Sequence, residues 1–344
     1  MAIPSPDAPA RIFTLTLNPC IDMGVSVDKV EPEHKLRCEQ PRREPGGGGL
    51  NVTRAIAELG GKSTAVFPAG GKTGDLLKFL VGHYCTGKSC DQRGVPVMAP
   101  TRENVIVTET STGNQFRFNM PGAELSEDEA RACLDALVDG VGGVQSGDGH
   151  HGLAVISGSL PPGVQPPFVR TIIDAVRAVG GRVVVDSSGP ALTEALGAGV
   201  CMVKPNRREL SQTIGGISAD ESNPAIVGAA AMDLARKHSV TYVLVSMGGD
   251  GAVLATKDGF AHCAAPKINV KSATGAGDSM VAAAVLAIEQ GRSPQEILRD
   301  GVAAGAAAAL TPGTELLKRP DFERLRDAMP LPTMVRPTTE EAKA

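Results

Sequence analysis

The sequence predicts an α/β fold: a three-layer sandwich of helices about a mostly parallel central sheet, with a small β-sheet lid. Short runs of β-branched residues alternate with segments of helical periodicity along most of the chain. Such alternation is typical of right-handed βαβ units, whose ligands bind beyond the carboxyl ends of the strands. Two half-polar segments with alternating residues interrupt this order, and they are the expected lid strands.

We expect one kinase-sized domain over residues 11–330, with a disordered tail at 1–10 and a flexible tail at 331–344. Buried strands are predicted at 11–17, 63–67, 153–157, 182–186, 200–204 and 242–246. Helices are predicted at 50–59, 75–81, 126–138, 167–179, 225–237, 277–290 and 294–310. The lid strands are expected at 22–38 and 101–118, paired in a small antiparallel sheet.

Composition excludes several classes of function. The chain has 344 residues with a formal net charge of -4, so neither nucleic acid nor an anionic membrane is expected as its main partner. No apolar run reaches membrane-spanning length, and residues 1–10 lack the order of a signal peptide. The seven cysteines are an odd number without a CxxC pair, which favours reduced thiols and a cytoplasmic location.

A glycine turn before a helix is the most informative motif. In it, Thr274 precedes Gly275, Ala276 and Gly277, and Asp278 follows where the helix begins. Glycines allow close backbone approach, and a helix N-terminus attracts anions. With Asp278 as a proton acceptor, the motif is suited to phosphoryl transfer to a hydroxyl. The alternative is that Asp278 only caps its helix, and the motif by itself supports both interpretations equally.

A run of four glycines, 46–49, leads directly into the predicted helix at 50–59. A flexible linker is the alternative, but a linker is not expected to abut an amphipathic helix. Close approach of the backbone to a ligand is therefore favoured, with Asn51 facing sugar hydroxyls.

Three motifs follow predicted strands, where a ligand or a simple turn could account for them. In the first, Asn206 begins a helix and Glu209 comes three residues later, which fits either a capping box or a water-mediated Mg²⁺ site. The second, Ser246 to Gly251, is by itself best explained as a hairpin turn. The third, starting at Ser157, is a turn whose hydroxyls could face a ligand.

Two further segments are expected to lie at the surface. Residues 82–89 match the P-loop pattern G-x-x-x-x-G-K-[ST] with Lys88, but a helix precedes them and the turn-like segment 90–96 follows. A P-loop joins a strand to a helix, so we interpret the match as coincidental. The glycine-rich segment 140–152, with His150 and His151, is predicted to be a surface loop.

Cations in the expected lid form the last group of candidates. They are Lys35, Arg37, Arg102 and Arg117. The simplest interpretation of each is that it lies on a solvated charged face. If the lid strands instead bring several of these cations together at the opening of a site, they would hold a phosphate.

In their order along the chain, these motifs resemble the ribokinase/PfkB family of carbohydrate kinases, from about residue 11 to 329. The resemblance is carried by Thr14-Leu15-Thr16-Leu17-Asn18-Pro19 with Asp22, by Lys35-Leu36-Arg37-Cys38, by the loop 46–51, by Phe67-Pro68-Ala69-Gly70-Gly71, by 157–163, by Lys204-Pro205-Asn206 with Glu209, and by 274–279. It implies the ribokinase-like sandwich and a lid that forms a homodimer clasp.

The resemblance also implies a role for each candidate residue. Asp278 would be the catalytic base, and Gly275, Ala276 and Gly277 the anion hole. The sugar phosphate would be held by Asp22, Gly47, Gly48, Asn51, Ser157, Lys35 and Arg102, and by Arg117 of the partner subunit. Lys204, Asn206, Ser246, Gly248, Gly251 and Thr274 would bind ATP, and Glu209 would bind Mg²⁺ through water. Backbone groups of Ser272, Thr274, Ala308, Thr311 and Gly313 would hold K⁺.

The implied reaction is ATP-dependent phosphorylation of fructose 6-phosphate at its 1-hydroxyl. Four glycines at 46–49 favour this branch over fructose-1-phosphate kinases, whose loop usually contains a lysine. Tagatose 6-phosphate kinase and a catalytically silent sugar-phosphate sensor are the alternatives. The chain departs from the family pattern at 82–100, where residues 84–92 are extra.

Overall fold

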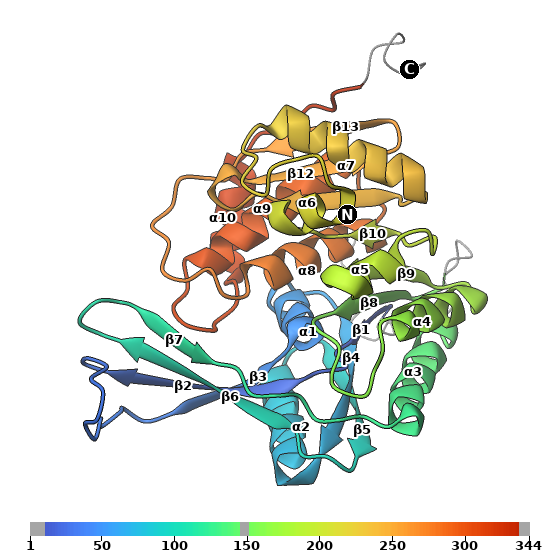
Figure 1. Cartoon of the computed structure of the whole chain (residues 1–344). Helices are drawn as coiled ribbons and strands as arrows, with labels where there is room; N and C mark the ends of the chain where they lie inside the picture. The colour runs from blue at the N-terminus through green and yellow to red at the C-terminus, as the bar shows by residue number, and fades with distance from the viewer. Residues whose placement is uncertain (1–10, 145–150, 337–344) are drawn as a thin grey trace.

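The computed structural model describes residues 11–144 and 151–336, and its centre is a nine-stranded sheet (Figure 1). The strands lie in the order β13 (Gly259–Cys263), β12 (Ala252–Thr256), β11 (Tyr242–Ser246), β10 (Met202–Val203), β9 (Arg182–Asp186), β8 (Leu153–Ser157), β1 (Ile12–Leu15), β4 (Ser63–Gly70) and β5 (Cys90–Val97). Pairing is parallel from β11 to β5, whereas β11, β12 and β13 pair antiparallel. The predicted mostly parallel sheet is confirmed.

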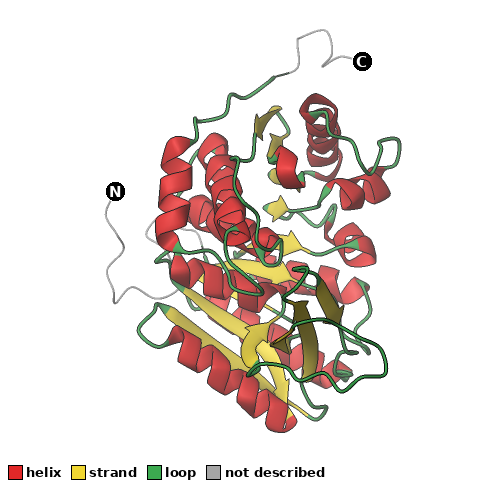
Figure 2. Cartoon of the chain, turned by 90° about the vertical axis from the view of Figure 1, so that its left-hand side faces the viewer, coloured by secondary structure: helices red, strands yellow, loops and turns green. Residues whose placement is uncertain are grey.

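Helices cover both faces of this sheet, as Figure 2 shows. One layer consists of α3 (Glu127–Gly142), α4 (Pro167–Ala178), α5 (Gly189–Ala195), α6 (Arg207–Ile214) and α7 (Pro224–His238). The other consists of α1 (Gly48–Glu58), α2 (Gly71–Cys85), α8 (Ala276–Glu289), α9 (Pro294–Ala309) and α10 (Arg319–Ala328). Valine, leucine, isoleucine and alanine fill the core between the layers, because the chain has few aromatic residues.

The lid is a second sheet that projects from the body beside α2 (Figure 1). Its strands lie in the order β3 (Arg42–Gly46), β2 (Cys20–Val27), β6 (Arg102–Glu109) and β7 (Gln115–Phe118). The prediction of a purely antiparallel lid is wrong, because β2 and β6 pair parallel. Both strands leave the body at the same end, with Cys20 opposite Arg102, so they run side by side in one direction.

Two segments predicted to be loops lie wholly or partly in a strand or a helix. The segment 90–96, expected to be turn-like, lies in strand β5 at the edge of the sheet, where Gly94 and Pro96 are tolerated. Residues 140–142 of the predicted loop 140–152 form the last turn of α3, and 145–150, with His150, lie outside the described residues. Of the predicted tail 331–344, residues up to 336 are described, and Val335 pairs with Phe260 of β13.

The expectation of reduced thiols throughout is wrong for one pair, because Cys85 and Cys90 form a disulfide with Cα atoms 5.3 Å apart. Cys85 ends α2 and Cys90 begins β5, so the short turn between them brings the two sulfurs together. Among the described residues, no helix is long and apolar enough to cross a membrane.

A small apolar cluster fixes α2 against the sheet and thereby supports the base of the lid. Leu77 of α2 is fully buried and packs in this cluster with Phe67 of β4 and Ile21 of β2. On the other side of α2, Phe79 is 66% exposed. The helix therefore offers a buried and an exposed apolar side chain for comparison.

We expect Leu77→Ala to lower the free energy of unfolding by about 2–5 kcal/mol, because it removes buried methyl groups and leaves a cavity. Urea denaturation followed by circular dichroism measures this loss. Phe79→Ala is the matched control and is expected to change stability by about 0.5 kcal/mol or less. Equal losses in the two variants would contradict the packing described for α2.

Candidate functional site

The candidate site lies where the carboxyl ends of the central strands meet the N-termini of α1 and α8. These two helices lie side by side against the sheet (Figure 1). Gly47 is the N-cap of α1 and Gly275 is the N-cap of α8, and neither helix has a capping side chain. A helix N-terminus without a side-chain cap leaves amide N–H groups free to bind an anion. The structure therefore places two helix ends that are suited to an anion at the edge that such sheets use for ligands.

Asp278 lies in the first turn of α8, and its carboxylate is not used for capping. Its Oδ2 accepts a hydrogen bond of 2.9 Å from Nδ2 of Asn51, which lies in the first turn of α1. The interpretation of Asp278 as a helix cap is therefore wrong. Gly275 has a φ of 75°, and a Cβ there would lie 2.6 Å from Leu316, so glycine is required at this turn.

The environment of Asp278 makes its carboxyl group less acidic than usual. Desolvation of this half-buried residue and the nearby negative charge of Asp186 raise the pKa of Asp278 to about 6. The hydrogen bond from Asn51 and the positive charges of Lys204 and Arg54 act in the opposite direction and limit the rise. A carboxylate with such a pKa is ionised at pH 7 and accepts a proton more readily than an ordinary aspartate.

Asp186, at the end of β9, joins two predicted site residues into one group. Its Oδ1 lies 3.1 Å from Nζ of Lys204, and its Oδ2 accepts a hydrogen bond of 3.4 Å from Ser157. Burial lowers the pKa of Lys204, but the ion pair with Asp186 and the negative charges of Asp278 and Glu209 together outweigh that effect, so the pKa is raised and the ammonium stays charged. A Cβ on Gly277 would lie 3.5 Å from Nζ of Lys204. The ammonium therefore lies directly beneath the glycine turn that precedes Asp278.

The glycine run 46–49 packs against protein atoms as well as lining the site. A Cβ on Gly48 would lie 2.3 Å from Oγ of Ser157, and one on Gly46 would lie 2.2 Å from Oδ2 of Asp22. Gly47 has a φ of 110°, which side-chain-bearing residues rarely adopt. Close packing against Ser157 and Asp22 thus accounts for these glycines in addition to any ligand.

The lid contributes one acid and two arginines to this edge. Oδ1 of Asp22 accepts a hydrogen bond of 2.9 Å from the buried Asn104. Arg102 donates to the carbonyl oxygens of Asn18 and Met120, at 3.1 and 3.0 Å. These contacts hold Arg102 at the base of the lid, next to the body of the protein.

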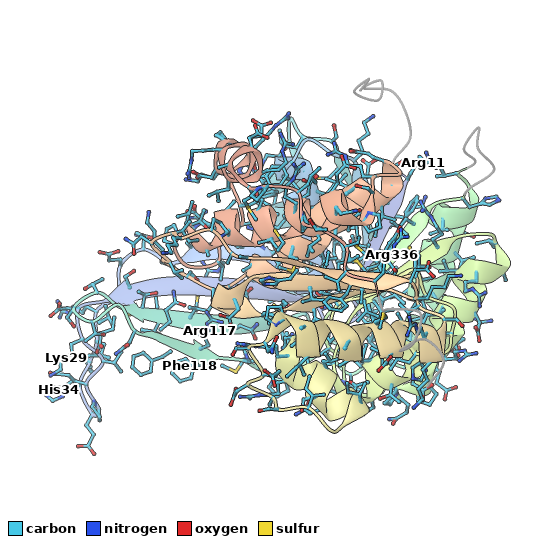
Figure 3. All side chains as sticks on the ribbon, turned by 90° about the horizontal axis from the view of Figure 1, so that it is seen from above. Arg11, Lys29, His34, Arg117, Phe118 and Arg336 are labelled. Atoms are coloured by element: carbon cyan, nitrogen blue, oxygen red, sulfur yellow. A yellow bond between two sulfur atoms is a disulfide. The ribbon has the colours of Figure 1, made fainter. Side chains whose placement is uncertain are left out.

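Arg117 and Lys35 lie differently from expectation. Arg117 donates a hydrogen bond to the hydroxyl of Thr274 within the same chain, so a partner subunit is not needed to bring it to the glycine turn. Lys35 lies in the exposed loop between β2 and β3, next to His34, which Figure 3 shows at the outer end of the lid. The structure therefore brings Arg102 and Arg117, but not Lys35, to the site of their own chain.

The residues predicted to bind ATP lie next to the group formed by Asp186 and Lys204. Asn206 and Glu209 form the capping box that the sequence allowed, with the backbone N–H of Asn206 donating to Glu209 at 2.8 Å. Ser246, at the end of β11, forms an isolated parallel β-bridge with Asn206. Gly248 and Gly251 have positive φ values in the turn that joins β11 to β12, so the hairpin interpretation is confirmed. No cluster of three metal-ligating side chains occurs in 11–144 or 151–336, and Glu209 is thus a single carboxylate, which suits Mg²⁺ that keeps its waters.

The residues expected to hold a monovalent cation also come together. The hydroxyl of Ser272 donates to the carbonyl oxygen of Gly313 at 2.9 Å, and the amide of Thr274 donates to Ser272 at 3.2 Å. The hydroxyl of Thr311 lies 2.7 Å from the carbonyl oxygen of Ala308. Carbonyl and hydroxyl oxygens thus gather beside the glycine turn, and this donor set fits a hard cation.

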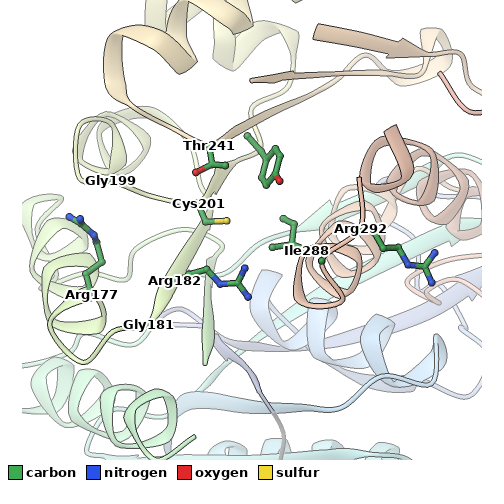
Figure 4. Close-up of a pocket in the computed structure, with 10 residues that line it drawn as sticks. Arg177, Gly181, Arg182, Gly199, Cys201, Thr241, Ile288 and Arg292 are labelled. Atoms are coloured by element: carbon green, nitrogen blue, oxygen red, sulfur yellow. The ribbon is translucent and has the colours of Figure 1, made fainter. Parts of the chain in front are cut away.

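A separate cavity of about 380 Å³ lies at the opposite edge of the sheet, where β9 and β11 begin (Figure 4). Arg177, Arg182 and Arg292 line it. Arg177 donates to the carbonyl oxygen of Ala198 and Arg292 pairs with Asp300, so both side chains are held by groups of the protein itself. This cavity is remote from Asp278 and is not part of the candidate site.

Sequence reasoning missed Asp186, Asn104 and Arg54. Asp186 ends a strand that was predicted with its observed bounds, so its position at the ligand-binding edge was the available signal. Asn104 and Arg54 are buried polar residues. Their burial depends on tertiary packing, which no local pattern reveals.

Known proteins of one family match this chain. The model of the pfkB family carbohydrate kinases matches residues 15–321. The chain is 40% identical to the ATP-dependent 6-phosphofructokinase isozyme 2 of Escherichia coli (strain K12), over 92% of this chain and 97% of that protein. It is 30% identical to the 1-phosphofructokinase of Bacillus subtilis (strain 168), over 88% and 95% of the two chains.

Solved structures agree with these relatives. Phosphofructokinase-2 from Escherichia coli in complex with potassium superimposes with a TM-score of 0.84 at 40% identity, covering 92% of this chain and 98% of that one. The same enzyme in complex with fructose-6-phosphate gives a TM-score of 0.83, with the same identity and coverage. Ribokinase from Thermotoga maritima, 21% identical with a TM-score of 0.69, covers 92% of this chain and 99% of its own and shares the fold. The chain therefore belongs to the pfkB family of carbohydrate kinases.

Proposed function

We propose that the protein is an ATP-dependent 6-phosphofructokinase, which transfers the γ-phosphoryl group of ATP to the 1-hydroxyl of fructose 6-phosphate and yields fructose 1,6-bisphosphate and ADP. The observation that carries this proposal is the Asp278 carboxylate, held by Asn51 at the start of α8, where the helix has no side-chain cap. A proton acceptor and an anion-binding helix end are thereby adjacent, as phosphoryl transfer to an alcohol requires.

In the proposed reaction, Asp278 accepts the proton of the 1-hydroxyl as that oxygen forms a bond to the γ-phosphorus. The bond from the γ-phosphorus to the bridging oxygen of ADP breaks in the same displacement. The amides of Gly275, Ala276 and Gly277 stabilise the negative charge on the transferred group, and Lys204 beneath them adds a positive charge.

The sugar phosphate is proposed to lie between the glycine run and the lid. Asp22, Asn51 and Ser157, with the backbone of Gly47 and Gly48, would bind its hydroxyl groups. Arg102 and Arg117 would bind its phosphate, because guanidinium groups offer planar, paired donors to phosphate oxygens. The greater identity to a 6-phosphofructokinase than to a 1-phosphofructokinase supports fructose 6-phosphate as the acceptor.

The nucleotide is proposed to bind along Asn206, Ser246, Gly248, Gly251 and Thr274. Glu209 would hold Mg²⁺ through water next to the nucleotide phosphates, and the ion would neutralise phosphate charge there. K⁺ would be held by oxygens around Ser272, Thr274, Ala308, Thr311 and Gly313, beside the anion-binding turn. The potassium complex of the Escherichia coli enzyme supports this assignment.

Assembly and location stay predictions. Exposed apolar side chains on the lid, Phe116, Phe118 and Met120, support a homodimer formed through it. Lys35, at the outer part of the lid, would then reach a site only in the partner subunit. The cytoplasmic location was expected from reduced thiols, and the Cys85–Cys90 disulfide does not add to that support.

The acceptor is tested by measuring ADP release with Mg·ATP and each of fructose 6-phosphate, fructose 1-phosphate, tagatose 6-phosphate, ribose and adenosine. We expect the highest kcat/KM with fructose 6-phosphate. A higher value with one of the other sugar phosphates would reassign the substrate. Release with none of the five would favour a sensor of sugar phosphate without catalysis.

We expect Asp278→Asn to fold and bind ATP while its turnover falls at least about a hundredfold, because the amide accepts no proton. Coupled ADP assay and ATP titration by calorimetry measure the two properties. Asp174→Asn, an exposed aspartate on α4, is the matched control and should stay within about twofold of the unaltered protein. A near-normal rate for Asp278→Asn would remove Asp278 from the mechanism.

The raised pKa of Asp278 predicts the pH dependence of the reaction. The base works only when it is deprotonated, so kcat/KM should rise with pH and level off above an apparent pKa of about 6. A pH–rate profile from pH 5 to 8.5 at constant ionic strength measures this midpoint. A profile that is already level at pH 5, as expected for an aspartate with the ordinary pKa of about 4, would show that the carboxylate is not desolvated as the structure indicates.

A further inference from the structure

Arg54 is a buried cation one turn along α1 from Asn51. Its side chain is 4% exposed, and its guanidinium donates at 3.2 Å to Oδ1 of Asn51, at 2.9 Å to the carbonyl oxygen of Pro45, and at 3.0 Å to Oε1 of Glu44. A buried arginine needs such partners, because an unpaired charge in the interior is strongly unfavourable. Arg54 therefore links the glycine run, the lid strand β3 and the residue that holds the base.

The contact with Asn51 determines which way its side-chain amide faces. A guanidinium has only donors, so it pairs with the amide oxygen and not with the NH₂ group. With Oδ1 directed to Arg54, Nδ2 faces Asp278, to which it donates at 2.9 Å. With the amide reversed, two oxygens would face each other at Asp278, and only a protonated carboxyl group could hydrogen-bond there.

The surroundings hold Arg54 in this position from two sides. Glu44 is fixed by the hydroxyl of Thr314 and by Arg42, which lies 3.2 Å from Oε1 of Glu44. The guanidinium carbon of Arg54 lies 4.7 Å from the ring centre of Tyr84, a cation–π contact. Rotation of the guanidinium away from Asn51 would break several of these contacts at once.

The segment that departs from the family pattern supplies part of this support. The hydroxyl of Tyr84 donates to Glu58 at 2.5 Å, and Lys88 pairs with the same carboxylate and lies 4.0 Å from the ring centre of Tyr84. Lys88, the lysine of the P-loop-like pattern, is thus occupied by protein groups on the flank of α1. The match is coincidental as a phosphate site.

We infer that Arg54 is a positioning residue for the phosphoryl transfer: it fixes the amide of Asn51 so that Nδ2 faces Asp278, and it thereby keeps that carboxylate in its proton-accepting form. This inference rests on the proposed function. Arg54 touches neither the reacting atoms nor, by its contacts, a substrate. Its effect is exerted through Asn51 and through its positive charge.

The first test removes the charge without leaving Glu44 unpaired, in the double variant Arg54→Met/Glu44→Gln. We expect the midpoint of the pH profile of kcat/KM to rise by roughly one unit, because an amide donor and a nearby cation are both lost. Activity should recover at high pH, where Asp278 is ionised again. The exposed Arg170, replaced in Arg170→Met, is the matched control and should leave the midpoint unchanged.

A purely structural role for Arg54 predicts a different result. It would lower the melting temperature or reduce kcat/KM equally at every pH, and the midpoint would stay near 6. An unshifted midpoint in a folded double variant, confirmed as folded by circular dichroism, overturns the inference.

A milder pair of variants covers the case in which the double variant does not fold. Arg54→Lys keeps the charge but loses the fork that reaches Asn51, and we expect kcat to fall about tenfold, as for one hydrogen bond to a charged group. In an Asn51→Ala background, the same replacement should have little further effect, because the two residues act in series. Equal losses in both backgrounds would overturn the inference.

The unaltered protein is assayed in the same series, so failure of the proposed function is seen separately. If it releases no ADP with any of the sugar phosphates, the proposed function fails, and Arg54 is tested without turnover. Carboxyl ¹³C NMR then follows the titration of Asp278, assigned by its absence in Asp278→Asn. A higher pKa in Arg54→Met/Glu44→Gln than in the unaltered protein supports the inference, and an equal pKa overturns it.

Discussion

The hydrogen bond between Asn51 and Asp278 joins the two helices on which the candidate site depends. A carboxylate removed from water is stable only where donors and positive charges replace its hydration. Asn51 supplies the donor from α1, and Lys204 and Arg54 supply positive charge from the sheet edge and from the same helix. Each cation is in turn paired with a carboxylate, Asp186 or Glu44, so with Asp278 the charges at the centre of the molecule form one network of three carboxylates and two cations.

This network explains why small residues lie where α1 and α8 begin. The two helix ends must approach the sheet edge closely enough for Asn51 to reach Asp278, and the glycines at 46–49 and at 275 allow that approach. Gly48 lies against Ser157, which also contacts Asp186. The same glycines that bring the helices together also leave their first amides uncovered for an anion. Packing and anion binding therefore depend on the same residues.

Local sequence patterns predicted the buried parallel strands best. Strands β8, β9 and β11 have the predicted bounds, because both faces of a central strand are covered and its middle residues form an apolar run. Strand β5 was missed because an edge strand is polar and tolerates Gly94 and Pro96. The order of the lid strands depends on where the chain leaves the body, and no residue near β2 or β6 encodes that.

The candidate site shows the same division. Gly275 and Asp278 were found because a glycine turn at a helix start is a local pattern. Asp186, in contrast, contacts Ser157 and Lys204 from other strands, and Arg54 matters through the contact of its neighbour Asn51 with the distant Asp278. Asp278 and Asp186 lie near the start of α8 together with Lys204, whereas Arg102 and Arg117 lie on the lid side, where they are suited to a phosphate. A chain with a net charge of -4 offers a phosphorylated sugar no long-range attraction, so the proposed binding would depend on these local cations and on the helix ends. The placement of the lid against the body, more than the composition of the chain, accordingly determines whether such a substrate can bind with its hydroxyl next to Asp278.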